Sequence, residues 1–376
     1  MKQFLKRSLI LVLVAVLSFF IFTPSAPRSG LQIYKSGVEV TIPCSTYTSS
    51  EDVKIGSRFL ELVLGKEGKE DQTVLLIPGG GIFGAKIKQS YVTVQNPGEV
   101  RELKVGDKIL SLNGKTITSV SDVKKYAQDI KSGELSIACE RSGKHFTVVL
   151  KPQEIDGEYK LGIVLKDGTA GIGTITYIDP KTGSFGGLGH GICDTDTGEV
   201  IPLTTGEVTG VILSGVKKGE EGKPGELSGI LTDKVSGTIY ANTECGVFGK
   251  LYSIPEGASV TPIKIAHRDE VHEGEATIIS SVKIGTPKEF KIKITNINKS
   301  STGTKSFRIE ILDPTLLAIT GGVVRGMSGS PVIQDGKLVG AVTHVLVANP
   351  TEGYGIFIEN MLSASESARN ELPKSA

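Results

Sequence analysis

The sequence is organised around one stretch, Thr320-Gly-Gly-Val-Val-Arg-Gly-Met-Ser-Gly-Ser-Pro-Val-Ile-Gln-Asp-Gly-Lys-Leu-Val-Gly-Ala-Val342. It sets Ser328 between two glycines and ahead of a strand-turn-strand pattern. Glycine lets the backbone turn tightly, so that the N–H groups of Gly326 and Ser328 can converge on a developing oxyanion. The pattern therefore indicates a nucleophilic serine, provided that a base lies nearby. The alternatives are an ordinary Gly/Ser turn and a role for Ser330 as the reactive serine.

Five histidines are available as the base, and His190 is the best candidate. It stands between glycines in Gly186-Gly-Leu-Gly-His-Gly-Ile192, far upstream of the serine. A histidine followed by a Gly-framed serine is the order found in chymotrypsin-like double β-barrels. Cys193 could be imagined as a thiol nucleophile, but it lacks the glycine-flanked setting of Ser328. His267 and His272 do not have the H-E-x-x-H spacing of a zinc site, so their charged stretch predicts a solvated loop.

The amino-acid composition limits the fold classes and the binding partners that are expected. A chain of 376 residues with 39% hydrophobic and 22% charged residues predicts two or three packed domains. The net charge of +1 gives no electrostatic footprint for nucleic acid. The 47 glycines and the absence of tryptophan favour a mainly β protein with many tight turns. Four cysteines without C-x-x-C spacing allow one or two disulfide bridges but indicate no metal site, and no cofactor is expected.

The N-terminus carries an export signal. A basic segment ending at Arg7 precedes the apolar run of residues 8–22, so residues 1–27 are predicted to be a membrane helix. An uncleaved anchor is favoured over a removed signal peptide, because Ser25-Ala26 is a poor cleavage site. Positive charge before the run places the rest of the chain outside the cytoplasm. Residues 28–70 are predicted to be a tether.

Residues 71–152 resemble a PDZ domain. The most specific pattern is Leu103-x-Val-Gly-Asp-x-Ile-x-x-x-Asn-Gly-x-x-Ile117, and a helix with a capping sequence follows it at residues 119–130. By this resemblance, the carboxylate-binding loop and the strand after it contain Ile82, Phe83, Gly84 and Ala85, which would hold a peptide C-terminus. The alternative is a groove occupied by the protein's own chain.

Residues 153–376 consist of short strands separated by turns, which predicts barrels or sandwiches. The order of membrane segment, PDZ domain and peptidase domain, with the His190 and Ser328 motifs, resembles the stage IV sporulation protein B serine peptidase of endospore-forming bacteria. This resemblance implies a chymotrypsin-like double β-barrel. It makes Ser328 the nucleophile, His190 the general base and Asp313 the third group. Asp313 could instead cap the turn Asp-Pro-Thr, and Asp194 and Asp196 are rival orienting groups.

The resemblance also implies a function. The protein would cleave itself near its N-terminal segment and cleave a membrane regulatory protein, so that a sporulation sigma factor is processed. Its place would be the space between forespore and mother cell, and its partners would be a protein substrate and itself. His344, in the segment after the serine hairpin, is a candidate specificity residue, with a buried structural histidine as the alternative. The rival function is a non-catalytic PDZ scaffold with a peptidase-like binding domain.

Overall fold

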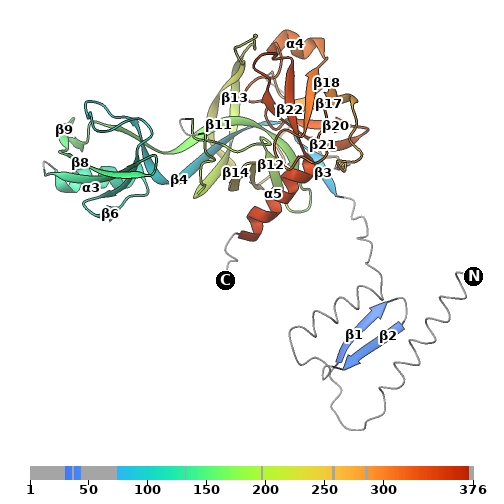
Figure 1. Ribbon diagram of the computed structural model, residues 1–376, viewed down its shortest axis with the longest axis horizontal. Helices are drawn as coiled ribbons and strands as arrows, with labels where there is room; N and C mark the ends of the chain where they lie inside the picture. The colour runs from blue at the N-terminus through green and yellow to red at the C-terminus, as the bar shows by residue number, and fades with distance from the viewer. Residues whose placement is uncertain are drawn as a thin grey trace, which may run out of the picture. The chain divides into compact units, whose positions relative to one another are not determined.

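The computed structural model describes residues 74–131, 133–195, 198–255, 259–283 and 287–371, and the backbone of two strands nearer the N-terminus. Those two strands, β1 (Gly30–Lys35) and β2 (Val38–Pro43), form an antiparallel pair (Figure 1). They belong to a unit of residues 1–72 that is separate from the unit of residues 73–376. The predicted membrane anchor and most of the predicted tether lie outside the described residues. Among the described residues, no helix is both long enough and apolar enough to cross a membrane.

The first β-barrel is a ring of strands in which each pairs with the next and the last pairs with the first. In ring order these strands are β4 (Ile82–Asn96), β11 (Val164–Ile178), β12 (Ser184–Gly187), β15 (Gly246–Leu251), β14 (Glu226–Thr243) and β13 (Thr205–Lys217). Alternate residues of β4 point into the barrel, because side chains alternate between the two faces of a strand. Phe83, Ala85 and Ile87 are all buried there, together with Phe185 and Ile239.

The second β-barrel is closed in the order β17 (Gly274–Ser280), β18 (Lys288–Thr295), β19 (Phe307–Ile311), β22 (Glu352–Phe357), β21 (Lys337–Val345) and β20 (Pro331–Gln334). Its core includes the fully buried Ile278, Ile292, Ile309 and Val342. Helix α4 (Pro314–Thr320) connects β19 to the serine stretch. Helix α5 (Ile358–Glu371) contacts strands of both barrels (Figure 1). The expected mainly β fold with closed barrels is confirmed.

A PDZ-like unit lies between β4 and β11 in the chain. It contains β5 (Lys108–Leu112), β6 (Lys115–Thr116), α3 (Val120–Ile130), β7 (Leu135–Arg141) and β8 (Lys144–Leu150), followed by the hairpin of β9 (Gln153–Ile155) and β10 (Glu158–Lys160). Helix α3 begins with the predicted capping box, in which Ser119 and Asp122 accept each other's backbone N–H groups. Val92, Ile109 and Ile137 are fully buried in a core of this unit's own.

The predicted domain boundaries need one correction, because β4 and β11 each contribute residues to two hydrophobic cores, that of the first barrel and that of the PDZ-like unit. The first half of β4 pairs with β11 and β13 in the first barrel, whereas its second half pairs with β5 in the PDZ-like unit. Ahead of them, β3 (Leu75–Pro78) pairs with β11 and with β16 (Ile263–Lys264). The peptidase barrels therefore begin before the PDZ-like unit, not at residue 153. Side-chain alternation continues unchanged along a long strand and does not reveal where it passes from one core to another.

Candidate active site

The turn before β20 presents Ser328 between two glycines with positive φ, Gly326 at 97° and Gly329 at 96°. A side chain at Gly329 would place its Cβ 2.0 Å from the Thr174 carbonyl oxygen and 2.5 Å from the Leu188 nitrogen. Both the φ angle and the close approach therefore require glycine at this position. The backbone can pass this close to the first barrel only because no side chain intervenes.

The two serines of the motif have different environments. Ser328 is partly buried, and its hydroxyl donates a 2.7 Å hydrogen bond to the Thr343 carbonyl on β21. Ser330 is fully buried, and its hydroxyl is 3.1 Å from the hydroxyl of Ser280. Ser328 is thus the hydroxyl that a substrate can reach, and Ser330 packs the interior.

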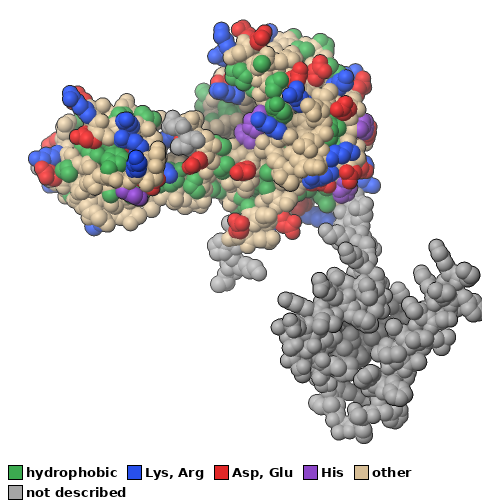
Figure 2. All heavy atoms as spheres, viewed as in Figure 1, with side chains coloured by type: hydrophobic (Ala, Val, Ile, Leu, Met, Phe, Trp, Pro, Cys, Tyr) green, Lys and Arg blue, Asp and Glu red, His purple; other side chains and the backbone are tan. Residues whose placement is uncertain are grey.

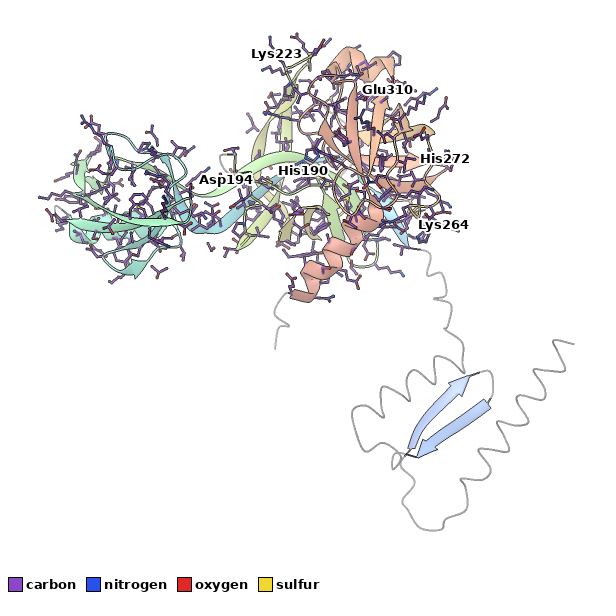
Figure 3. All side chains as sticks on the ribbon, viewed as in Figure 1. His190, Asp194, Lys223, Lys264, His272 and Glu310 are labelled. Carbon is purple, nitrogen blue, oxygen red and sulfur yellow. The ribbon has the colours of Figure 1, made fainter. Side chains whose placement is uncertain are left out.

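The loop that carries His190 follows β12 of the first barrel and packs against the second. A Cβ at Gly189, whose φ is 68°, would lie 2.9 Å from the Thr343 side chain. The imidazole of His190 (Figure 3) lies beside that of His344, with 5.0 Å between the ring centroids. His344 is the next residue after Thr343, whose carbonyl binds Ser328. The predicted nucleophile and the predicted base therefore contact consecutive residues of β21, Thr343 and His344.

The tautomer of His190 follows from its hydrogen bond. Its Nδ1 lies 2.8 Å from the Gly191 carbonyl oxygen, which can only accept, so we assign the proton to Nδ1. The lone pair of Nε2 is then free to take a proton. Burial lowers the pKa of His190, and the bond to Gly191 opposes this without reversing it. The imidazole is therefore neutral at pH 7, as a general base must be.

Asn242 fixes the backbone just beyond His190 and was not foreseen from the sequence. Its Oδ1 accepts from the Ile192 N–H, and its Nδ2 donates to the carbonyls of Ile192 and Ile201, all at 2.8 Å. A lone asparagine near the end of a strand carries no sequence signal for such a role. The three bonds hold both ends of the loop of residues 192–201.

We expect the acid limb of kcat/KM to report His190. The protonated form of a histidine cannot act as a base, so the rate should rise with pH through the pKa of the free enzyme. Because burial places the pKa of His190 below the ordinary 6.5, the midpoint should lie below 6.5. Initial rates on a neutral peptide substrate between pH 4 and 8 measure it. A midpoint above 6.5 would contradict the assignment.

Asp313 does not orient His190 in the structure, and the resemblance-based role is corrected here. Its carboxylate caps helix α4, with Oδ1 accepting from the N–H groups of Thr315 at 2.9 Å and Leu316 at 3.1 Å. Burial and the Gly191 carbonyl are the influences on the pKa of His190, and neither is a carboxylate. Asp-Pro-Thr is a strong helix-start sequence, which is why this role prevails. Of the rival orienting groups, Asp194 lies 3.7 Å from the Lys166 ammonium and Asp196 lies outside the described residues.

Asp313→Asn should therefore leave kcat close to that of the wild type. Asparagine caps helices about as well as aspartate, so the free energy of unfolding should also change little. Asp313→Ala should lower that free energy by about 1 kcal/mol. Urea unfolding and peptide hydrolysis of both variants give the two quantities. A fall in kcat of about 10⁴-fold in Asp313→Asn, the loss seen when a triad aspartate is replaced, would restore the orienting role.

Peptide planarity fixes the direction of two backbone N–H groups of the serine turn relative to the hydrogen bonds of their carbonyls. The Met327 carbonyl accepts from the Ser330 N–H at 2.9 Å, so the Ser328 N–H, in the same trans peptide unit, points the opposite way. The Arg325 carbonyl accepts from the Leu227 N–H at 2.8 Å, which aims the Gly326 N–H in the same manner. Within the described ranges, neither the Gly326 nor the Ser328 N–H donates to a backbone carbonyl. Both are free to bind a developing negative charge, as the glycine pattern predicts.

Two buried threonines of β11 hold the nucleophile turn, residues 326–329, and no sequence signal pointed to them. The Thr174 hydroxyl donates to the Gly326 carbonyl and the Thr176 hydroxyl to the Gly329 carbonyl, each at 2.8 Å. The Thr174 N–H also donates to the Ser328 carbonyl at 2.9 Å. In the sequence they resemble ordinary strand threonines. Their hydroxyls join the first barrel to the turn of the second.

His344 combines burial with an unsatisfied ring nitrogen. Its Nδ1 is buried and has no hydrogen-bond partner among the described residues. Burial and the nearby His190 and Lys305 lower the pKa of His344 to about 4. The ring is therefore neutral at pH 7.

The predicted peptide-binding loop of the PDZ-like unit is wrong. Ile82, Phe83, Gly84 and Ala85 lie on β4, where all four pair with β11 on one edge and Gly84 and Ala85 also pair with β13 on the other. Phe83 and Ala85 are 2% exposed. A strand hydrogen-bonded on both edges cannot accept a peptide as an additional strand.

A different edge borders the helix of the PDZ-like unit. Helix α3 contacts β10 and β11, and its Val120 N–H donates to the Asp167 carboxylate at 2.9 Å. Leu161 and Ile163, which frame Gly162 at the start of β11, are partly buried against the core of this unit. From Val164 to Lys166, β11 pairs with β4 on one edge. The sequence signal that could have located this edge is Leu161-Gly-Ile163.

Comparisons with known proteins agree with the peptidase chemistry. A family model described as SpoIVB peptidase S55 matches residues 157–362. A curated protein of Lactococcus lactis named as a zinc metalloprotease is 30% identical over 112 residues, which cover 30% of this chain and 25% of that protein. A counterpart in Rhizobium meliloti is 28% identical over 96 residues, or 25% of this chain and 26% of that protein. The chain thus spans about a quarter of the length of these curated relatives.

Matches among the solved structures come from two bacteria. The active form of the Rv3671c protease from M. tuberculosis is 12% identical, with a TM-score of 0.32 over 55% of this chain and 78% of that chain. The PDZ domain of the SdrC-like protein from Listeria monocytogenes is 22% identical, with a TM-score of 0.20 over 22% of this chain and 93% of that chain. The family match extends over more than half of the 376 residues, and the protein therefore belongs to the SpoIVB peptidase S55 family.

Proposed function

We propose that this peptidase is an extracytoplasmic, membrane-tethered serine endopeptidase that works with a dyad of Ser328 and His190. The observation that carries the proposal is that Ser328 and His190 contact consecutive residues of β21, Ser328 the Thr343 carbonyl and His190 the His344 ring. In place of a carboxylate, the backbone carbonyl of Gly191 orients the imidazole. The protein is a member of a peptidase family, and the dyad is the chemistry that its described residues support best.

Acyl transfer follows from the positions of these groups. The Ser328 hydroxyl leaves the Thr343 carbonyl, turns to His190 and gives its proton to Nε2 while Oγ attacks the scissile carbonyl. The N–H groups of Gly326 and Ser328 bind the oxyanion. The C–N bond then breaks, and the imidazolium gives its proton to the leaving amine. Water attacks the acyl enzyme by the same route, with His190 again acting as base, and releases the acid product.

A fluorophosphonate probe tests the assignment, because it reacts with activated serines only. Purified protein should be labelled, and mass spectrometry of its fragments should place the label on Ser328. The rival function, a non-catalytic scaffold, predicts no label at any serine. Heat-denatured protein is the control for labelling that does not depend on the fold.

Self-cleavage and a role in sporulation are further parts of the proposal. They are supported by the sequence resemblance and by the basic and apolar N-terminal segment. N-terminal sequencing of the mature protein should find new ends between residues 30 and 75, and cell fractionation should find the uncut form in membranes. A single unprocessed species in the soluble fraction would reject both the anchor and self-cleavage. Cleavage of a membrane regulatory protein in the space between forespore and mother cell would be tested by immunoblotting of that protein in cells that lack the peptidase.

The PDZ-like unit is proposed to recognise a peptide of the substrate, of the protein itself or of a partner. Nucleic acid is not proposed as a partner, because the sequence has a net charge of +1 and Figure 2 shows charges of both signs interspersed on the face in view. The edge of β11 near helix α3 is the position that fits an added strand. Titration of labelled peptides with free C-termini into the protein measures this binding.

His344 is proposed to select the substrate side chain before the scissile bond. The His344 ring lies beside that of the proposed base, His190. A site with buried polar groups rejects substrates that leave those groups unpaired. We expect His344→Ala to change the cleavage sites, mapped by mass spectrometry, more than it lowers fluorophosphonate labelling. Unchanged fragment ends and rates would show that His344 is structural.

A further inference from the structure

The hairpin of β13 and β14 belongs to the first barrel, but its tip reaches the second (Figure 1). The Gly219 N–H donates to the Thr320 carbonyl at 2.8 Å, and the Gly222 N–H donates to the Val347 carbonyl at 2.9 Å. These acceptors lie on either side of the nucleophile turn in sequence, one before it and one beyond β21. The tip is therefore hydrogen-bonded to the end of helix α4 and to the segment after β21.

The same hairpin pairs with the residue that begins the nucleophile turn. The Arg325 N–H donates to the Gly225 carbonyl at 2.9 Å, and the Leu227 N–H donates to the Arg325 carbonyl at 2.8 Å. This is a short parallel β-bridge between Glu226 and Arg325. It contacts both peptide units of Arg325, including the one that contains the Gly326 N–H.

The orientation of that second peptide unit decides whether an oxyanion is attracted or repelled. In a planar trans peptide the carbonyl and the N–H point in opposite directions. While the Leu227 N–H holds the Arg325 carbonyl, the Gly326 N–H faces away from the hairpin. If the unit rotated, the partial negative charge of the Arg325 carbonyl would occupy the place of the donor. One oxyanion donor contributes about 10² to 10³ in kcat, so this orientation matters greatly.

Close packing keeps the bridge in place. A Cβ on Gly225 would lie 2.4 Å from the Lys217 carbonyl oxygen and 2.6 Å from the Val324 side chain. Leu227 is 2% exposed, and its side chain lies 3.0 Å from the position of a Cβ on Gly326. Only glycine allows the hairpin to approach the turn this closely.

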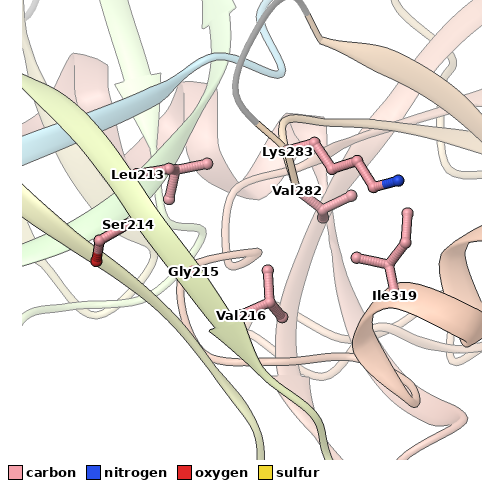
Figure 4. Close-up of a pocket in the computed structure, with 7 residues that line it drawn as sticks. All are labelled: Leu213, Ser214, Gly215, Val216, Val282, Lys283 and Ile319. Carbon is pink, nitrogen blue, oxygen red and sulfur yellow. The ribbon is translucent and has the colours of Figure 1, made fainter.

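One stretch of the hairpin borders an open pocket. A pocket of about 440 Å³ lies along β13 and next to Ile319 of helix α4 (Figure 4). Gly215 of β13 lines this pocket, and a Cβ built there would meet no atom within 4 Å. On this side, the main-chain bonds of the tip and the packing of Leu213 and Leu227 into the second barrel's core hold the hairpin, while Gly215 has space around it.

We propose that the β13–β14 hairpin is a positioning element for catalysis, which holds the peptide unit between Arg325 and Gly326 so that its N–H faces the oxyanion. The inference rests on the proposed role of Ser328 as nucleophile. Gly225 and the backbone N–H of Leu227 are its positioning groups, and they act through Gly326 without touching the substrate.

Two alanine variants of the same hairpin provide the first test. Gly225→Ala should push the bridge away from Arg325 and lower kcat on a peptide substrate by about 10²-fold, with KM within twofold of the wild type. Gly215→Ala is the matched control, because its added methyl group enters the open pocket, and its kcat should equal that of the wild type. Equal kcat in both variants, or a change in KM alone, would overturn the proposal.

A second variant covers the case in which Gly225→Ala does not fold. Replacing Leu227 by the α-hydroxy acid analogue of leucine changes one N–H into an ester oxygen and keeps the side chain. We expect kcat to fall at least tenfold, with fluorophosphonate labelling of Ser328 slowed in proportion. Wild-type kcat in the ester variant would refute the hairpin role while leaving Ser328 as the nucleophile. No labelling of the wild-type protein would refute the proposed dyad itself.

Discussion

Ser328→Ala is expected to lower kcat by about 10⁶-fold and to remove fluorophosphonate labelling, because the variant has no nucleophile at the turn. Its stability should hardly change. The hydroxyl is partly buried and makes one hydrogen bond, to the Thr343 carbonyl. The free energy of unfolding should therefore stay within about 1 kcal/mol of the wild-type value. Hydrolysis of a fluorogenic peptide measures kcat, electrophoresis of the probe-treated protein measures fluorophosphonate labelling, and urea unfolding measures the free energy of unfolding.

Ser330→Ala is the matched control in the same motif. Its hydroxyl is fully buried against that of Ser280, so its removal should cost about 1 kcal/mol of stability and leave labelling at Ser328. If labelling were kept in Ser328→Ala and lost in Ser330→Ala, the nucleophile would be Ser330 and not Ser328.

Arg268→Ala is expected to lower the free energy of unfolding by about 2 to 3 kcal/mol, the largest stability loss that we expect from a single polar side chain here. The guanidinium binds the Glu359 carboxylate and the Asn360 side chain at the start of helix α5. It also donates to the carbonyls of Lys299 and Ser301 in the loop before β19. Without it, a partly buried carboxylate and several acceptors lose their donor. Urea unfolding measures the loss.

The pH dependence of this loss has a definite sign. Burial alone would raise the pKa of Glu359, but hydrogen bonds from Arg268 and His267 outweigh it and place that pKa below its ordinary 4.5. The pair therefore stabilises the fold above pH 4.5, and its contribution disappears as pH falls through the lowered pKa. The difference between wild type and Arg268→Ala should shrink in acid. Arg308→Ala, whose exposed guanidinium is 3.7 Å from Glu352, should cost less than about 1 kcal/mol. Equal losses in the two variants would contradict the role given to the Arg268 network.

Local chemistry explains which predictions from the sequence succeeded. Glycines on both sides of Ser328 and of His190 were visible in the sequence, and the structure uses them for the tight turns that local sterics require. The capping box at Ser119 and the capping role of Asp313 are likewise decided within a few residues. Strand alternation with many glycines indicated barrels, because it marks half-buried, tightly turning strands.

The two errors have different origins. The resemblance gave Asp313 to the catalytic site, whereas the backbone N–H groups two and three residues later hold its carboxylate at a helix start. The local sequence already offered that role. The resemblance also gave Ile82 to Ala85 to a peptide groove, although β11 pairs with all four residues and β13 with Gly84 and Ala85. This second outcome depends on which strands lie beside β4 in the folded protein.

By itself, the sequence determined the candidate nucleophile and the candidate base, the turns that present them, the strand-rich fold and the PDZ-like pattern. All of these follow from backbone sterics and side-chain periodicity over short distances. Only the tertiary structure decided that β4 and β11 run from one core into another and that Thr174 and Asn242 hold the two catalytic loops. It also decided that Leu227 orients the peptide unit of Gly326. The physical reason is that these are hydrogen bonds between residues about 50 to 150 positions apart, whose partners are chosen by barrel closure and not by local propensity.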